Sequence, residues 1–143
     1  MGIEELKEIV DYGVIGILGL MSFLAFWFWI ERLLFFRKVD LSKYKNRELL
    51  EVDLTNNITI ISTIGANAPY IGLLGTVIGI IITFYIMGES GNLDAKTIMK
   101  SLALALKATA LGLLVAIPAT ILYNHLSRKI EVLLAKWDAL YKK

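Results

Sequence analysis

Three long apolar stretches set the strongest limit on how this chain can fold. They cover about residues 12–30, 60–87 and 101–123. A helix needs about 20 residues to cross roughly 30 Å of hydrocarbon, and each stretch provides about that many. The 57% hydrophobic content and the mean hydropathy of +0.65 are far above those of a soluble domain of 143 residues. We therefore predict an all-α integral membrane protein, with three transmembrane helices and a single domain over residues 1–143.

The distribution of lysine and arginine indicates how the spans are oriented. Before the first span there are four acids and only Lys7, so this segment is a retained anchor and not a cleaved signal sequence. Positive residues near span ends stay in the cytoplasm. We expect an outer N terminus, a cytoplasmic loop over about residues 31–59 and a cytoplasmic C-terminal helix over about residues 124–143. The basic residues that follow the first and third spans are Arg32, Arg37, Lys38, Lys43, Lys45, Arg47, Arg128, Lys129, Lys136, Lys142 and Lys143.

Small and hydroxyl residues form a stripe along two of the predicted spans. In the second span, helical spacings of four, three and four separate Gly72, Thr76, Gly79 and Thr83. The third span has a similar stripe of Ala105, Thr109, Gly112, Ala116 and Thr120. Such stripes let membrane helices approach closely, and hydroxyls add polarity to a contact or a pore wall. Two interpretations stay open: the stripes alternate around an axis in an assembly, or they only pack the helices of one subunit together.

Helix boundaries and a cytoplasmic extension can also be predicted. The second long helix should begin near residues 55–57, and Asp94 should cap the third after an outer turn over residues 88–94. Beyond the third span we expect an amphipathic helix whose apolar seam lies in water unless copies associate. A ring of copies would cover that seam. The seam residues recur at steps of four, three, four and three: Leu126, Ile130, Leu133, Trp137 and Leu140.

Several kinds of chemistry have no support in the sequence. Without cysteine, the chain can form neither disulfides nor thiolate sites. No extramembrane segment has paired carboxylates or a nucleophile with a base, so we expect no catalytic residue, no enzyme activity, no metal and no cofactor. A net charge of +2 gives no support to nucleic-acid binding. Lys107, the one strongly charged residue inside a span, lies roughly 160° around the helix from Thr109. We expect it at a lipid or subunit contact, and His125 at the membrane boundary.

A family resemblance rests on several motifs that occur in order. Residues 68–80 are Ala-Pro-Tyr-Ile-Gly-Leu-Leu-Gly-Thr-Val-Ile-Gly-Ile, and residues 108–113 are Ala-Thr-Ala-Leu-Gly-Leu. Ala-Ile-Pro-Ala follows at 116–119, Tyr-Asn at 123–124, and Glu31-Arg32 ends the first span. Together these motifs resemble the ExbB, TolQ and MotA family of ion-driven motor subunits over most of the chain. Three spans with an outer N terminus are similar to the ExbB and TolQ branches, whereas MotA has four spans and a large cytoplasmic domain.

The resemblance implies a multi-pass protein of the bacterial inner membrane that assembles as a pentamer. Its second and third helices would surround a pore holding the spans of an ExbD- or TolR-like partner, a single-span protein with an intramembrane Asp. Proton flow through that Asp would energise a TonB-like protein for uptake across the outer membrane. The family's two path-lining threonines correspond here to Thr76 and Thr109. Helix contacts are expected at Gly72, Gly75, Gly79, Gly112 and Pro118, and lipid or subunit contacts at Arg32 and Lys107.

One position departs from the family pattern. ExbB and TolQ usually carry a Glu five residues before the third-span Thr, where this chain has Leu104. Since no span has an acid in its middle, the partner must supply any carboxylate that carries the proton. A TolQ-like subunit of an envelope-maintenance system also stays open. So does a protein of another class, a passive scaffold or small transporter subunit, which would need no partner with an intramembrane Asp.

Overall fold

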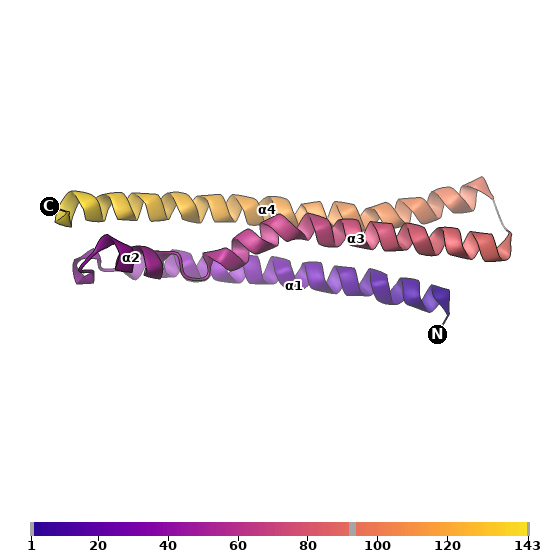
Figure 1. Cartoon of the computed structure of the whole chain (residues 1–143), viewed down its shortest axis with the longest axis horizontal. Coiled ribbons are helices and arrows are strands. Elements are labelled where there is room, and N and C mark those ends of the chain that lie inside the picture. Colours follow the sequence, from indigo (N-terminus) through magenta and orange to yellow (C-terminus); the bar gives the residue numbers. More distant parts are fainter. Residues whose placement is uncertain (1, 92–93, 143) are drawn as a thin grey trace.

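The protein is an elongated bundle of three long helices. The computed structural model describes residues 2–91 and 94–142, and helices and turns without any β-strand make up that part. In chain order the elements are α1 (Ile3–Lys38), a 3-10 turn (Leu41–Lys43), α2 (Arg47–Leu54), α3 (Ile58–Ser90) and α4 (Ala95–Tyr141). Figure 1 shows α1, α3 and α4 side by side along the bundle, with α2 near the C terminus. The three long helices are apolar enough to cross a membrane, which confirms the predicted fold class.

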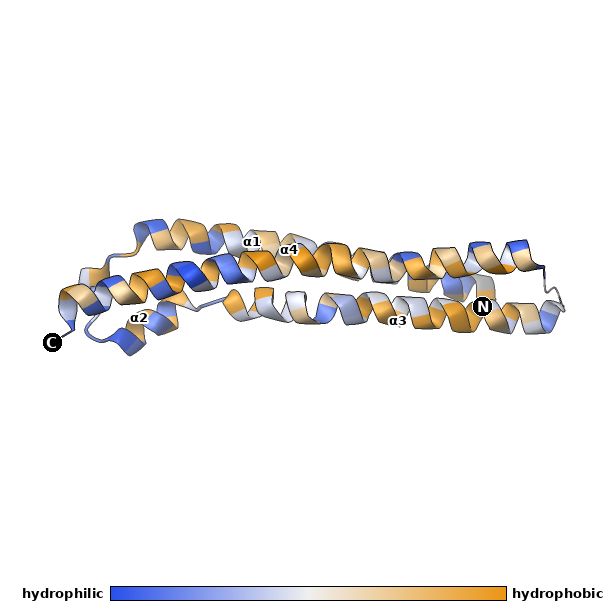
Figure 2. Cartoon of the chain, turned by 90° about the horizontal axis from the view of Figure 1, so that it is seen from above, coloured by the Kyte–Doolittle hydropathy of each residue, from blue (hydrophilic) through white to orange (hydrophobic). Residues whose placement is uncertain are grey.

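The polarity of the bundle changes along its length. The start of α1, the end of α3 and the start of α4 lie toward one end, and α2 and the end of α4 lie at the other. Hydrophilic residues gather around α2 and the C-terminal half of α4, whereas the middle of the bundle is largely apolar (Figure 2). At about 1.5 Å per residue, the 47 residues of α4 extend over about 70 Å. This helix is therefore much longer than the hydrocarbon core, as expected for a span with an extension into water.

The capping residues lie where the sequence predicts them. Asn57 precedes α3 in the left-handed conformation (φ 69°), and the Asp94 side chain accepts a hydrogen bond from the Thr97 amide at the start of α4. The outer turn begins later than expected, because α3 continues to Ser90. Gly91 ends it at φ 71°, a conformation that glycine adopts without a Cβ clash.

The expected loop over residues 31–59 is largely helical. It contains the last turns of α1 and also α2, a helix that was not predicted from the sequence. Local signals for α2 are present, since the Asn46 side chain accepts from the Leu49 amide as an N-cap and two leucines four residues apart face inward. Those leucines, Leu50 and Leu54, are fully buried. The segment therefore folds back onto the long helices.

The prediction of a water-exposed apolar seam was wrong. Leu126, Ile130 and Trp137 are buried within the subunit, and Leu134 takes the place expected for Leu133. Only Leu140 is largely exposed, at 67%. The seam packs against α2, the end of α1 and the start of α3, which together form the largest core of the protein. Because one chain covers the seam, the seam gives no reason for copies to associate.

Candidate functional site

The closest of the described glycine contacts joins α3 to α4 inside the membrane half. A Cβ added to Gly72 would lie 2.5 Å from the Ala108 carbonyl oxygen and 3.0 Å from the Gly112 Cα. A Cβ added to Gly112 would lie 2.6 Å from the Ala68 carbonyl oxygen. The two glycines therefore face each other, and their backbones touch because neither has a side chain. Both predicted stripes meet here within one chain, as the subunit-packing interpretation requires.

The neighbouring glycines continue the same contact at slightly greater distances. A Cβ on Gly75 would lie 3.0 Å from both Ala108 Cβ and a methyl of Val14, and a Cβ on Gly79 would lie 3.1 Å from Ala105 Cβ. Gly75 therefore also brings α1 close to the pair. Pro118 is half-buried inside α4, which continues past it to Tyr141. The structure thus brings together the four glycines predicted at helix contacts.

Thr76 and Thr109 also meet at this contact. Their hydroxyl oxygens are 2.5 Å apart, and the Thr76 hydroxyl donates a hydrogen bond to the Ala105 carbonyl at 2.9 Å. Thr76 is 5% exposed, and Thr109 is half-buried. Thr83, the other hydroxyl of the α3 stripe, instead donates to the Gly79 carbonyl of its own helix at 2.8 Å. Among the described residues, only Thr76 and Thr109 link the two helices by a bond between side-chain hydroxyls.

The number of available protons decides which threonine donates the hydrogen bond between Thr76 and Thr109. A hydroxyl has one proton to donate and two lone pairs that accept. Since the Thr76 proton goes to the Ala105 carbonyl, the Thr109 hydroxyl is the donor in the bond between the two threonines. The lone pairs of Thr109, on the more exposed side of the pair, stay available to a further donor. The arrangement can therefore accept a hydrogen bond from water or a protonated carboxyl without burying a charge.

Lys107 lies away from this pair, on the outer face of α4. Its side chain is exposed and lines a small groove of about 100 Å³ between α1 and α4. The same groove is lined by Asp11 from the start of the first span, and by Val14, Ile15 and Leu104. The placement away from Thr109 agrees with its helical phase. Asp11 is one of the four acids before the first span that were interpreted only as markers of orientation, so its position beside Lys107 was not predicted.

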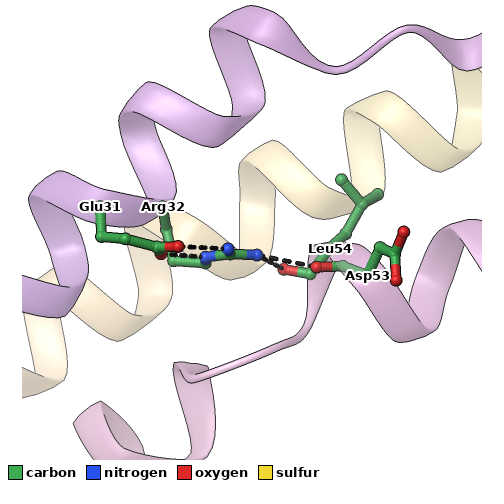
Figure 3. Close-up of polar contacts among 4 residues, drawn as sticks. All are labelled: Glu31, Arg32, Asp53 and Leu54. Atoms are coloured by element: carbon green, nitrogen blue, oxygen red, sulfur yellow. Dashed lines mark hydrogen bonds and ion pairs between the residues drawn. The ribbon is translucent and has the colours of Figure 1, made fainter.

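Arg32 was expected at a lipid or subunit contact, but it is buried inside the subunit. There it joins the end of α1 to the end of α2. Its side chain is 3% exposed. Figure 3 shows it between Glu31 and the end of α2, where it donates to the Asp53 carbonyl at 2.7 Å and to the Leu54 carbonyl at 3.5 Å. The Glu31 carboxylate pairs with it at 2.5 Å. The guanidinium thus donates to carbonyls that the last turn of a helix leaves free. The Glu31 carboxylate balances its positive charge.

His125 lies where α1 and α4 leave the apolar region. The Trp29 indole N–H donates to His125 Nδ1 at 3.1 Å, and the two rings are 5.9 Å apart. The acceptor role of Nδ1 assigns the ring proton of the neutral imidazole to Nε2. This contact agrees with the expected boundary position.

These features define a class of protein: a three-span helical membrane protein in which a hydroxyl pair crosses the α3–α4 contact. The sequence profile of the MotA/TolQ/ExbB proton channel family matches residues 30–139, and the chain belongs to this family. It is 54% identical over 138 residues to the biopolymer transport protein ExbB of Aquifex aeolicus strain VF5, covering 96% of this chain and 93% of that protein.

Two proteins of Helicobacter pylori are similar over nearly their whole length. The biopolymer transport protein ExbB of strain J99 is 59% identical over 132 residues, covering 92% of this chain and 91% of its own. The putative biopolymer transport protein ExbB-like 2 of strain 26695 is 52% identical over 136 residues, covering 95% and 91%. These matches confirm the family resemblance that the motifs indicated.

Proposed function

We propose that this chain is the ExbB-type channel and motor subunit of a proton-driven system in the bacterial inner membrane. In this proposal it binds a single-span partner with an intramembrane Asp, similar to ExbD or TolR. Proton entry then drives a TonB-like protein for uptake across the outer membrane. Membership of a proton channel family and similarity to biopolymer transport proteins support the assignment. The proposal gives the chain no catalytic reaction, cofactor or metal.

The observation that carries this proposal is the hydroxyl pair of Thr76 and Thr109. A membrane segment tolerates a hydroxyl far better than an unpaired charge, so polar groups inside spans are functional candidates. The pair is fixed by the Ala105 carbonyl on one side, and Thr109 has free lone pairs on the other. Protonation removes the charge that makes the movement of a partner carboxylate through hydrocarbon costly. The protonated carboxyl can then donate a hydrogen bond to Thr109.

The proposed topology places the N terminus in the periplasm and the C terminus in the cytoplasm. The support is the concentration of basic residues at the end that holds α2 and the C terminus, together with the retention of positive charge in the cytoplasm. A pentamer around the partner spans is the assembly we propose. It rests on the family, since the seam is already covered within one subunit.

The test is proton flux in liposomes that contain the chain and its partner. Thr76→Val and Thr109→Val keep the side-chain shape and remove the hydroxyl, so they should assemble normally. The membrane potential supplies only about 2.3 kcal/mol per charge per 100 mV. Each 1.36 kcal/mol added to the barrier slows transfer about tenfold, so we expect flux to fall by roughly 100-fold or more in the double variant.

Thr83→Val is the matched control. It removes a hydroxyl that is equally buried on the same helix but bonds only to its own backbone. Lys107→Met should also retain most of the flux, since Lys107 lies on the opposite face of α4. Full flux in the Thr76→Val, Thr109→Val double variant would refute the hydroxyl-lined path.

A passive scaffold is the second candidate, because the glycine contact is satisfied entirely within one chain. A scaffold needs no partner with an intramembrane Asp. Purification of the chain from its native membrane in mild detergent, with identification of bound single-span proteins, separates the two candidates. Recovery of the chain without such a partner would favour the scaffold.

A further inference from the structure

A basic groove opens between α1 and α4, and His125 lines its membrane end. Its volume is about 510 Å³, and its walls combine apolar and cationic side chains. The apolar residues are Leu33, Phe36, Val132 and Leu133, and the cationic residues are Arg37, Arg128, Lys129 and Lys136. An amphipathic ligand that carries negative charge at its polar end is complementary to such a groove. We propose that it binds the headgroup of an anionic phospholipid from the inner leaflet.

The cations of the groove are available to a ligand. In residues 2–91 and 94–142, no carboxylate pairs with Arg37, Lys129 or Lys136. Arg128 pairs with Glu131 at 3.4 Å, but both side chains are more than two-thirds exposed, and an ion pair of this kind contributes little. Several uncompensated positive charges therefore surround one cavity. A phosphate group would replace water around them with charge-assisted hydrogen bonds.

The position of the groove favours a lipid over a soluble anion. Both of its walls are helices that enter from the predicted bilayer, and the groove begins where the apolar residues end. On the faces that lead into it, Phe26, Ile30 and Ile121 are 43%, 50% and 60% exposed, so acyl chains can lie along them. Basic pockets between membrane helices on the cytoplasmic side are typical binding places for anionic headgroups. The cytoplasmic location rests on the topology proposed above, but the binding itself does not depend on proton transport.

The test compares binding of phosphatidylglycerol and phosphatidylcholine to the full-length protein by native mass spectrometry in mild detergent. The pocket variant combines Arg37→Gln, Lys129→Gln and Lys136→Gln. The control variant combines Lys38→Gln, Lys43→Gln and Lys45→Gln, which removes the same charge from the same side outside the groove. Each basic side chain near a headgroup contributes roughly fivefold in affinity at low salt, so the pocket variant should bind phosphatidylglycerol roughly 100-fold more weakly. The control variant should keep the wild-type preference for phosphatidylglycerol.

Unchanged phosphatidylglycerol binding in the pocket variant would overturn the proposal. Displacement of the lipid by millimolar inorganic phosphate would also overturn it, because the groove would then be a site for free anions. If the pocket variant instead loses its subunit association while lipid binding persists, the groove is a contact between copies.

A second measurement does not depend on the variant folding. Affinity of the unmodified protein for phosphatidylglycerol should fall steeply with added salt, whereas the weaker binding of phosphatidylcholine should not. An affinity for phosphatidylglycerol that is independent of salt would contradict an electrostatic headgroup site.

Discussion

The two halves of α4 are held to the rest of the protein in opposite ways. In the membrane half, Gly112 lies against Gly72 so closely that a single added carbon would meet a backbone oxygen at about 2.5 Å. In the C-terminal half, Leu126 and Trp137 pack against Leu50 and Leu54 in a core of large side chains, here called the α2 core. One continuous helix therefore meets α3 through its backbone in one half and the α2 core through large side chains in the other.

This difference follows from the surrounding solvent. Lipid tails are as apolar as leucine, so burying a large side chain between membrane helices gains little, and close backbone packing becomes the source of stability. In water, each buried leucine contributes about 1.5–3 kcal/mol by leaving the solvent. Adding carbon should therefore be costly in the membrane half, whereas removing carbon should be costly in the other half.

The largest effect should come from removing carbon in the α2 core. Leu126 is fully buried, so Leu126→Ala should destabilise the protein by about 2–5 kcal/mol. Leu140→Ala on the same helix, where the side chain is 67% exposed, is the matched control and should change little. Thermal unfolding in detergent, followed by circular dichroism, measures both. Equal melting temperatures of the two variants would mean that the α2 core does not support the fold.

Removing the Arg32 guanidinium, which joins α1 to the end of α2, should cause the next largest loss of stability. Arg32→Met keeps the length of the side chain but leaves the carbonyls at the end of α2 without their donor. Hydrogen bonds to a charged group contribute about 1.5–3 kcal/mol, so a loss of that size is expected. Hydrogen exchange of the α2 amides should become faster. Lys38→Met, an exposed change on the same helix, should leave that exchange unaltered.

Adding carbon in the membrane half should destabilise the protein nearly as much. Gly72→Ala introduces one methyl group against the Ala108 carbonyl and should destabilise the helix pair by about 1–3 kcal/mol. Gly16→Ala is the control, since in the described structure a Cβ there meets no atom within 4 Å. The fraction of folded protein that survives heating in detergent distinguishes them. Matching changes in both variants would show that the close contact with α4 does not set the cost, since the gain in helix propensity from glycine to alanine is common to both.

The smallest effect concerns Tyr44, whose hydroxyl donates to the Asp53 carboxylate at 2.7 Å. Burial and this carboxylate raise the pKa of Tyr44 to about 12 from its ordinary 10.0. Folding therefore favours the protonated phenol, and the contribution of this contact is complete below pH about 10 and lost as the pH rises through about 12. Tyr44→Phe should cost about 1 kcal/mol at neutral pH.

Alkaline absorbance titration checks the shift in the pKa of Tyr44. Subtracting the Tyr44→Phe curve from that of the wild type should isolate a phenol that ionises near pH 12. Tyr12→Phe, at a side chain that is 74% exposed, is the reference variant. A difference curve centred near pH 10 would show that the contact with Asp53 does not form.

The parts of the fold that depend on local chemistry were predictable. Apolar length gave the three spans, and capping residues such as Asp94 gave helix starts, because both depend only on neighbouring residues. Helical phase also placed Lys107 away from Thr109. The rotation of one helix against another is not local. The meeting of Thr76 with Thr109, the target of Arg32 and the burial of the seam therefore required the structure.

The length of α4 has a mechanical consequence. Measured from Gly112 at the glycine contact to Tyr141, α4 extends over about 44 Å, so a tilt of one degree about that contact displaces the end of the helix by about 0.8 Å. The helix continues from Ala95 past Pro118 to Tyr141, so a small rotation at the level of Thr109 can reach the end of the bundle that holds α2. Pro118 has no backbone N–H to donate, so it is the point on this path where the helix bends most easily.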